Sequence, residues 1–437
     1  MPGIYCSGLC GVYVSNCQRL RADVVVYDYP NAVAGPISWA QRLPVLLRNH
    51  GIDVRVLLLH WGDVSGGVLH PALTSQGVPV CAFRVSDTHA NIRFLLKAIH
   101  DDPPDVFIAN HVTPALLISG YVRSQGIPAI AVLRSDDAFY HGVIDVVVGG
   151  RVRDRVSAVV GVSEFLTRMA KVRNPSMDCI RIPSGTPIPL RCAEAGGRLR
   201  LVYSGRLVEE QKRISETIEA FIRACTEFPS LEVVILGDGP ERARLEERVA
   251  ECSVDIRFLG RLPVAEMLDE LMRSHVIVLL SDYEGLPGAV VEGMACGLVP
   301  ICLRMRSGSD ELISHGLNGF IAEDRGAHFV ECIRELHGSW ERWSEMSRLA
   351  RHSIVERFSL DVVSRQWATL IRRLAGQLTP KRGFTIPVTL DLPPVHPALA
   401  AEDIRPEQAA TLRRVGHRLR RVLGKIRALL LRVCGSG

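Results

Sequence analysis

Two glutamates eight positions apart, Glu284 and Glu292, lie in the segment whose residue types best suit ligand chemistry, HVIVLLSDYEGLPGAVVEGMACGLVPIC. The pattern predicts a buried strand, a loop that carries Glu284, a helix that carries Glu292 and a second buried strand. The loop contains a tight turn. Its residues are Gly285, Leu286, Pro287 and Gly288.

This arrangement suits a phosphate and a sugar. Backbone N–H groups of the turn can approach an anion, and the start of the helix adds the positive end of its dipole. Glu292, expected about two turns into the helix, can accept hydrogen bonds from both hydroxyls of a ribose. Glu284 can do the same for a sugar. Two glutamates at this spacing also occur by chance, so the surrounding elements decide the interpretation.

Short apolar runs alternate with helical patterns along both halves of the chain, which predicts two parallel, doubly wound sheets. The first series starts at DVVVYD and the second at LRLVYSGR. Ligands of such sheets bind beyond the carboxyl ends of the strands, so two facing Rossmann-like units predict a cleft between domains. The expected divisions are an N-terminal segment 1–22, domains 23–187 and 198–357, a crossover helix 358–375, a Pro-rich linker 376–407 and a basic amphipathic helix 408–437.

Composition agrees with a folded enzyme of two domains. The chain has 437 residues, 47% of them hydrophobic and 23% charged. Its 12 cysteines are sparse and several lie in apolar runs, as expected of buried thiols in a reducing compartment. No signal peptide and no membrane-spanning helix is predicted, so we expect a cytoplasmic protein.

The net charge of +5 comes from the tail, because residues 408–437 hold eight Arg and Lys and no acidic residue. Without the tail's +8, the remaining chain has a net charge of −3. Apolar residues recur at helical spacing among the basic ones, which predicts a helix peripheral to an anionic membrane, at its inner face. Packing on a partner or on the body of the protein is the alternative. No aromatic residue interleaves the arginines, which argues against nucleic acid as a partner.

The Glu284–Glu292 segment resembles the E-x7-E motif of the retaining glycosyltransferases of family 4, which have the GT-B fold of two facing Rossmann-like domains. LRLVYSGRLVEEQKR resembles the Gly-Arg and Lys pattern of the same family. The resemblance extends over roughly residues 23–375. It implies donor-binding or catalytic positions at Gly205, Arg206, Lys212, Arg261, Leu262 and Gly35.

The family implies transfer of a sugar from a UDP- or GDP-linked donor to a hydroxyl of a carbohydrate or lipid-linked acceptor, with retention and without a metal or other cofactor. Arg206 and Lys212 would stabilise the departing diphosphate, because cations can offset charge that grows in the transition state. Glu284 would hold the donor sugar, Glu292 the ribose. The loop at Gly35 departs from the family, which often has two adjacent glycines there.

A sharper departure lies at AIAVLRSDDAFYHG, where many relatives carry a His that faces the donor sugar. Arg134 occupies the corresponding position, and a guanidinium cannot accept a hydrogen bond. Asp136 and Asp137 follow, and either could pair with Arg134 or bind acceptor hydroxyls. We interpret His111 as structural.

Two other classes of function remain open. A non-catalytic carbohydrate-binding or scaffold protein derived from a transferase is compatible with the change at Arg134. A nucleotide-sugar epimerase or a phosphorylase on the same fold would need further acid and base groups or a pyridoxal lysine, which the sequence does not single out. A dinucleotide oxidoreductase is disfavoured, because no GxGxxG follows the first strand.

Overall fold

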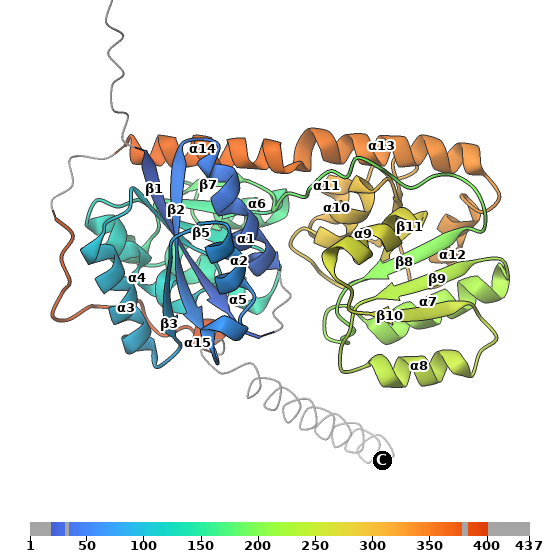
Figure 1. The fold of residues 1–437 in the computed structure, drawn as a ribbon, viewed down its shortest axis with the longest axis horizontal. Helices are drawn as coiled ribbons and strands as arrows, with labels where there is room; N and C mark the ends of the chain where they lie inside the picture. Colours follow the sequence, from blue (N-terminus) through green and yellow to red (C-terminus); the bar gives the residue numbers. More distant parts are fainter. Residues whose placement is uncertain (1–18, 31–34, 378–382, 401–437) are drawn as a thin grey trace, which may run out of the picture.

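The computed structural model describes residues 19–30, 35–377 and 383–400, and these form two α/β domains side by side (Figure 1). The expected segments that fall wholly or largely outside this part are the N-terminal segment and the basic helix 408–437. Each domain has one parallel sheet with helices on both faces. The strand orders are β3-β2-β1-β4-β5-β6-β7 and β10-β9-β8-β11-β12-β13. The prediction of two Rossmann-like domains is confirmed.

The N-terminal sheet is buried on both faces, as expected for parallel strands. Along β1, Val24 and Val26 face one core while Val25 and Tyr27 face the other. The elements of this domain are β1 (Leu20–Asp28), α1 (Gly35–Arg48), β2 (Ile52–His60), α2 (Leu69–Ser75), β3 (Val80–Arg84), α3 (Thr88–Asp101), β4 (Val106–Ala109), α4 (Thr113–Ser124), β5 (Ala129–Leu133), α5 (Ala138–Val143), β6 (Ala158–Gly161), α6 (Glu164–Arg173) and β7 (Asp178–Arg181). Short 3-10 and π-helical turns occupy Val64–Gly66, Val152–Asp154 and Ile144–Val148.

The C-terminal sheet is also flanked by amphipathic helices, and its buried side chains form one continuous core. Its elements are β8 (Arg200–Ser204), α7 (Ile214–Glu227), β9 (Glu232–Leu236), α8 (Arg242–Ala250), β10 (Ile256–Gly260), α9 (Val264–Met272), β11 (Val276–Leu279), α10 (Gly288–Ala295), β12 (Val299–Leu303), α11 (Ser309–Leu312), β13 (Phe320–Ala322) and α12 (Ala327–Arg334).

Two long helices tie the domains together along one side of the molecule (Figure 1). Helix α13 (Trp340–Phe358) packs on the C-terminal domain and α14 (Leu360–Ala375) returns to α1 of the N-terminal domain. The rings of Trp39 and Trp367 lie 5.3 Å apart in that contact. Ser359, between the helices, bridges to Thr186. The chain therefore passes between the domains at two adjacent places.

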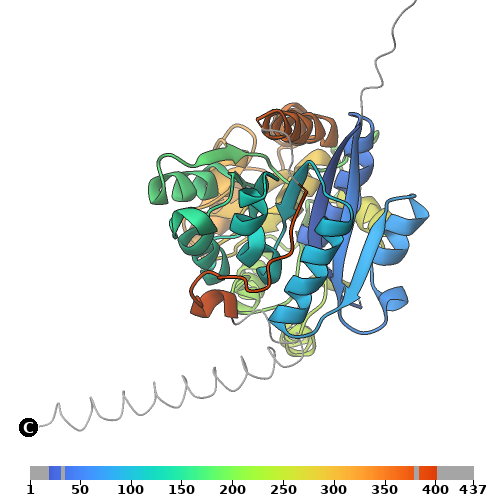
Figure 2. The same cartoon turned by 90° about the vertical axis from the view of Figure 1, so that its left-hand side faces the viewer.

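The described part of the expected linker is not a free spacer. Residues 383–400 run along the N-terminal domain and end in α15 (Pro397–Ala400), as Figure 2 shows. Phe384 and Leu399 are buried in the core under α3, α4 and α5. His100 Nδ1 lies 2.8 Å from the carbonyl oxygen of Phe384. Proline content predicts extended backbone, but it does not show whether that backbone packs on a domain.

Candidate functional site

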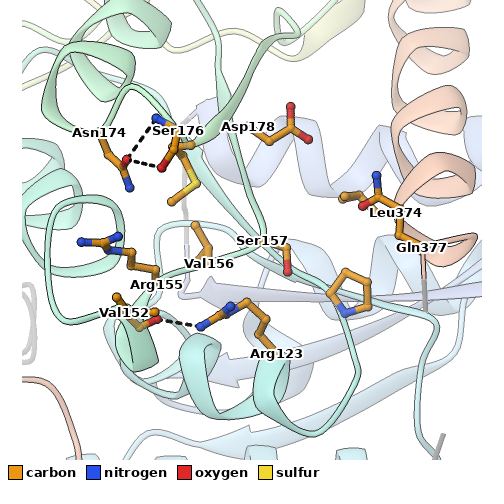
Figure 3. Close-up of a pocket in the computed structure, with 12 residues that line it drawn as sticks. Arg123, Val152, Arg155, Val156, Ser157, Asn174, Ser176, Asp178, Leu374 and Gln377 are labelled. Atoms are coloured by element: carbon orange, nitrogen blue, oxygen red, sulfur yellow. Dashed lines mark hydrogen bonds between the residues drawn. The ribbon is translucent and has the colours of Figure 1, made fainter. Parts of the chain in front are cut away.

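The residues singled out in the sequence gather mainly at the carboxyl ends of the strands, where the two domains meet. Arg206 follows β8, Glu284 follows β11, Arg261 and Leu262 follow β10, and Arg134 follows β5. Ligands of parallel sheets bind at this edge. A pocket of about 430 Å³ lies elsewhere, at the amino ends of β5, β6 and β7, between Arg123, Asn174 and Leu374 (Figure 3). We therefore place the candidate site between the domains and not in that pocket.

Side-chain hydrogen bonds and an ion pair join the loop after β8 to the loop after β11. Lys212 Nζ lies 2.5 Å from Glu284 Oε1, and both side chains are largely buried. Gln211 Nε2 donates to the carbonyl oxygen of Tyr283 at 2.9 Å, and Arg206 Nη2 donates to Gln211 Oε1 at 3.1 Å. Arg206 is exposed and its guanidinium has this neutral partner. Two cations and a carboxylate thus share one corner of the site.

The backbone of Glu284 is also fixed. The hydroxyl of the buried Ser307 donates to the carbonyl oxygen of Glu284. Gly308, in a left-handed conformation with φ of 85°, packs against the turn at Gly285 and Pro287. Ser307, Gly308 and Gln211 carry no local signal in the sequence, because their role depends on contacts between separate loops.

The turn after β9 packs closely against the backbone of Gly205 and Leu207. A side chain at Gly237, which has a φ of 135°, would overlap the carbonyl oxygen of Gly205, and one at Gly239 would overlap that of Leu207. The GDG turn after β9 therefore supports the loop that carries Arg206. Its glycines are explained by this close approach of backbone to backbone.

Glu292 lies closer to the start of its helix than expected, because α10 begins at Gly288 and places Glu292 about one turn in. Desolvation raises the pKa of Glu292, and the charge of Arg42 opposes that effect. Arg42 lies on α1 of the other domain, and its Nη2 is 3.9 Å from Glu292 Oε1. The turn from Gly285 to Pro287 precedes the helix, whose first N–H groups have no partners within it. An anion placed there would meet these N–H groups.

The N-terminal side of the site differs from expectation at Arg134. Neither Asp136 nor Asp137 pairs with it. Asp136 binds His141 Nε2 at 2.8 Å and, across the domain boundary, Arg306 Nη2 at 3.0 Å. Asp137 caps α5 by accepting a hydrogen bond from the backbone N–H of Tyr140 at 3.1 Å.

Two further predicted positions have distinct surroundings. Gly35 begins α1, and a Cβ there would contact none of the described residues within 4 Å. His111 has a φ of 58°, and its Nδ1 lies 2.8 Å from the hydroxyl of Tyr140 within the same domain. A further link between the domains joins Glu311 to Arg181 at 2.9 Å and to the backbone N–H of Glu164.

Comparison with known proteins places these observations in context. Residues 192–352 match the family model of the glycosyl transferases group 1. An exopolysaccharide phosphotransferase of Streptomyces coelicolor is 28% identical over 200 residues, which are 45% of this chain and 21% of that protein. N-acetyl-alpha-D-glucosaminyl L-malate synthase of Bacillus anthracis is 31% identical over 164 residues, 36% of this chain and 42% of that protein. The match therefore spans less than half the length of either relative.

Structural similarity covers both domains. A mutant of S. aureus TarM, solved in complex with fondaparinux, alpha-GlcNAc-glycerol and UDP, has a TM-score of 0.68 and 11% identity. The similarity covers 80% of this chain and 99% of that one. The described chain thus has the GT-B fold, and its matched family region contains every predicted site residue of the C-terminal domain.

Proposed function

We propose that this protein is a glycosyltransferase that transfers a sugar from a UDP- or GDP-linked donor to a hydroxyl acceptor, with retention of configuration and without a metal. The observation that carries the proposal is the joining of Lys212, Glu284 and the Arg206 loop at one corner between two Rossmann-like domains. The group 1 family match over the same residues supports it.

The chemistry follows from charge. A nucleoside diphosphate leaves with negative charge that grows in the transition state, and cations placed beforehand lower that barrier. Arg206, Lys212 and the N-terminus of α10 would supply positive charge to it. Because Lys212 is paired with Glu284, we expect donor binding to draw the ammonium toward the diphosphate and to release Glu284 for the hydroxyls of the sugar.

The remaining groups hold the donor and exclude water. Glu292 would accept hydrogen bonds from the ribose, displacing Arg42 from its carboxylate. The departing diphosphate would take the proton of the incoming hydroxyl, so no carboxylate pair at glycosidase geometry is required. Closure of the domains would limit hydrolysis of the donor. Small-angle scattering profiles that are equal with and without nucleotide would count against such closure.

A second part of the proposal concerns the acceptor and the basic tail, residues 408–437. Residues 401–437, which include the basic segment 408–437, lie outside the described part of the chain. Residues 383–400, which come before them, end in α15 on α5 of the N-terminal domain, the domain that is expected to face the acceptor. Within the described residues, no helix has the length and apolar character needed to cross a bilayer. We propose that the tail binds an anionic membrane surface and presents a lipid-linked acceptor. Unchanged binding to phosphatidylserine vesicles after deletion of 408–437 would contradict this.

Donor turnover tests the enzymatic proposal. Purified protein is screened by thermal shift with UDP, GDP and their sugars, and the stabilising donor is then assayed for hydrolysis or transfer. We expect turnover that falls by about 10²- to 10³-fold in Glu284→Ala, the range for loss of one transition-state contact. An exposed carboxylate of the same domain, Glu323, provides the control variant Glu323→Ala. Donor binding without any turnover would favour a non-catalytic carbohydrate-binding relative.

A further inference from the structure

Arg134 lies at the domain interface, next to the loop that carries Glu284. It follows β5 directly, and its carbonyl oxygen is so close to Gly285 of the other domain that any side chain there would overlap it. The proposed function places the donor sugar beside this loop. The backbone of Arg134 therefore adjoins the reacting part of the site.

The guanidinium of Arg134 is held by neutral groups. Its Nε donates to Asn110 Oδ1 at 2.6 Å, and its Nη1 donates to Ser184 Oγ at 3.2 Å. The guanidinium carbon lies 4.5 Å from the centre of the Trp39 ring. Its Nη2 is buried and has no hydrogen-bond partner among the residues that the structure describes. An orphaned, buried donor of this kind normally has a water, an ion or a ligand group as its partner.

The charge of Arg134 has no carboxylate partner in the described part of the chain. No acidic side chain there lies within ion-pair distance of it, and Asp136 and Asp137 are held elsewhere as described above. Burial lowers the pKa of Arg134 to about 10, so the side chain stays protonated at neutral pH. A buried cation without a counter-ion is unfavourable, and a bound anion relieves that cost.

The contacts of the guanidinium also place it near the donor. Asn110, which orients Arg134, donates from Nδ2 to the carbonyl oxygen of Pro36 at 3.3 Å. Pro36 belongs to the first turn of α1, directly after Gly35. The family resemblance implies a donor-binding position at Gly35, in this same turn. Arg134 thus stands between the start of α1 and the turn at Gly285.

We propose that Arg134 binds an oxyanion of the donor, which provides the missing counter-charge. This inference rests on the proposed function. The oxyanion has two sources with the same chemistry: an oxygen of the diphosphate, or a carboxylate on the transferred sugar, as in a hexuronic acid. Both suit the planar donor pattern of a guanidinium. Since Nη2 is shielded in the present arrangement, the anion reaches it when the side chain turns or the domains separate.

Calorimetric titration of the full-length protein and Arg134→Gln tests the inference. The ligands are UMP, UDP, UDP-glucose and UDP-glucuronate, with the guanosine series GMP, GDP, GDP-mannose and GDP-mannuronate in parallel. If the diphosphate is the partner, Arg134→Gln weakens UDP or GDP by about 10- to 100-fold, the usual value of a charged hydrogen bond, and spares the monophosphate. If a carboxylate is the partner, the loss is confined to the uronate donor, which the wild type prefers over the neutral sugar.

Two controls separate binding from folding. Arg304→Gln removes an exposed arginine that pairs with Glu323 of the same domain and should leave all affinities unchanged. Arg134→Lys keeps the charge but loses the planar donor set, so a smaller loss for the same ligand is expected, and this variant serves if Arg134→Gln does not fold. Wild-type affinity for every ligand in the Arg134 variants, with nucleotide binding intact, would overturn the inference alone. A wild type that binds no nucleoside diphosphate would overturn the proposed function as well.

Discussion

Lys212 Nζ and Glu284 Oε1 lie 2.5 Å apart and join the loop after β8 to the loop after β11. Both side chains are about nine-tenths buried. The pair fixes two loops that have no β-ladder contact with each other. It also keeps a cation and a carboxylate together in a site where an anionic donor would compete for the cation.

Removing one member of this pair should destabilise the protein. Lys212→Met leaves the Glu284 carboxylate without a counter-ion, and we expect the free energy of unfolding to fall by about 3–5 kcal/mol. Lys212→Met combined with Glu284→Gln should recover part of that loss, because no unpaired charge remains. Urea unfolding of the two single variants and the double variant gives the coupling energy. Strictly additive effects would mean that the two charges do not interact.

Gly285 and Gly383 provide a matched pair of substitutions, one at the domain boundary and one outside the proposed site. A Cβ at Gly285 would overlap the backbone of Arg134 across the domain boundary, whereas a Cβ at the exposed Gly383 would contact no described residue within 4 Å. We expect Gly285→Ala to reduce donor turnover at least about tenfold by displacing one domain against the other. Gly383→Ala should remain within about twofold of wild type. Equal activity of both variants would show that this contact is dispensable.

Glu292 should determine how strongly the site prefers a ribonucleotide over a 2′-deoxynucleotide. Wild type is expected to bind UDP or GDP about tenfold or more tightly than the 2′-deoxy nucleotide, because an ionised carboxylate loses a hydrogen-bond donor when the hydroxyl is removed. Glu292→Gln should lose most of this preference while it retains affinity for the deoxy nucleotide. Competition titration measures both. A ribose preference that survives in Glu292→Gln would assign the contact to another residue.

His275 gives a pH dependence that concerns stability and not catalysis. It is buried before β11, its Nδ1 accepts from the backbone N–H of Arg200 at 3.0 Å, and burial lowers its pKa to about 4. Between about pH 6.5 and pH 4 the unfolded chain therefore binds a proton that the folded chain excludes, so stability falls as pH falls.

The effect is at most about 3 kcal/mol across the window, because each unit of pKa difference corresponds to about 1.4 kcal/mol. Chemical unfolding at pH 7 and pH 4.5 measures it for the wild type and for His275→Gln, in which the slope attributed to His275 should disappear. His352→Gln, at an exposed position of α13, should keep the wild-type pH dependence. The same slope in His275→Gln and in the wild type would exclude this origin.

Local patterns allowed much of the fold to be predicted. The runs LRLVYS and HVIVLL are buried strands because parallel sheets are covered on both faces, and the loops after them hold Arg206 and Glu284 as expected. The helix α10 was expected to start earlier, since Gly288 and Pro287 are compatible with either turn or helix. Glu292 consequently lies one turn earlier in the helix than the sequence suggested.

Contacts between distant segments could not be predicted. Arg134 binds Asn110 and Ser184, 24 and 50 positions away, while the two acids beside it in sequence bind elsewhere. The approach of Arg42 to Glu292 depends on how the two domains meet. Phe384 lies in a proline-containing stretch typical of a linker, yet it is buried in the N-terminal core. Each of these features is a tertiary contact without a local signature.

The proposed site is tested most directly by measuring the affinity for a nucleoside diphosphate after Arg206 or Lys212 has been replaced by an uncharged residue. Titration of UDP and GDP against the wild type, Arg206→Gln, Lys212→Met and the exposed control Arg304→Gln measures it. We predict that each of the first two substitutions weakens the diphosphate by about 10- to 100-fold while the control leaves it unchanged. Diphosphate affinity equal to wild type in both Arg206→Gln and Lys212→Met would contradict the site proposed between the domains.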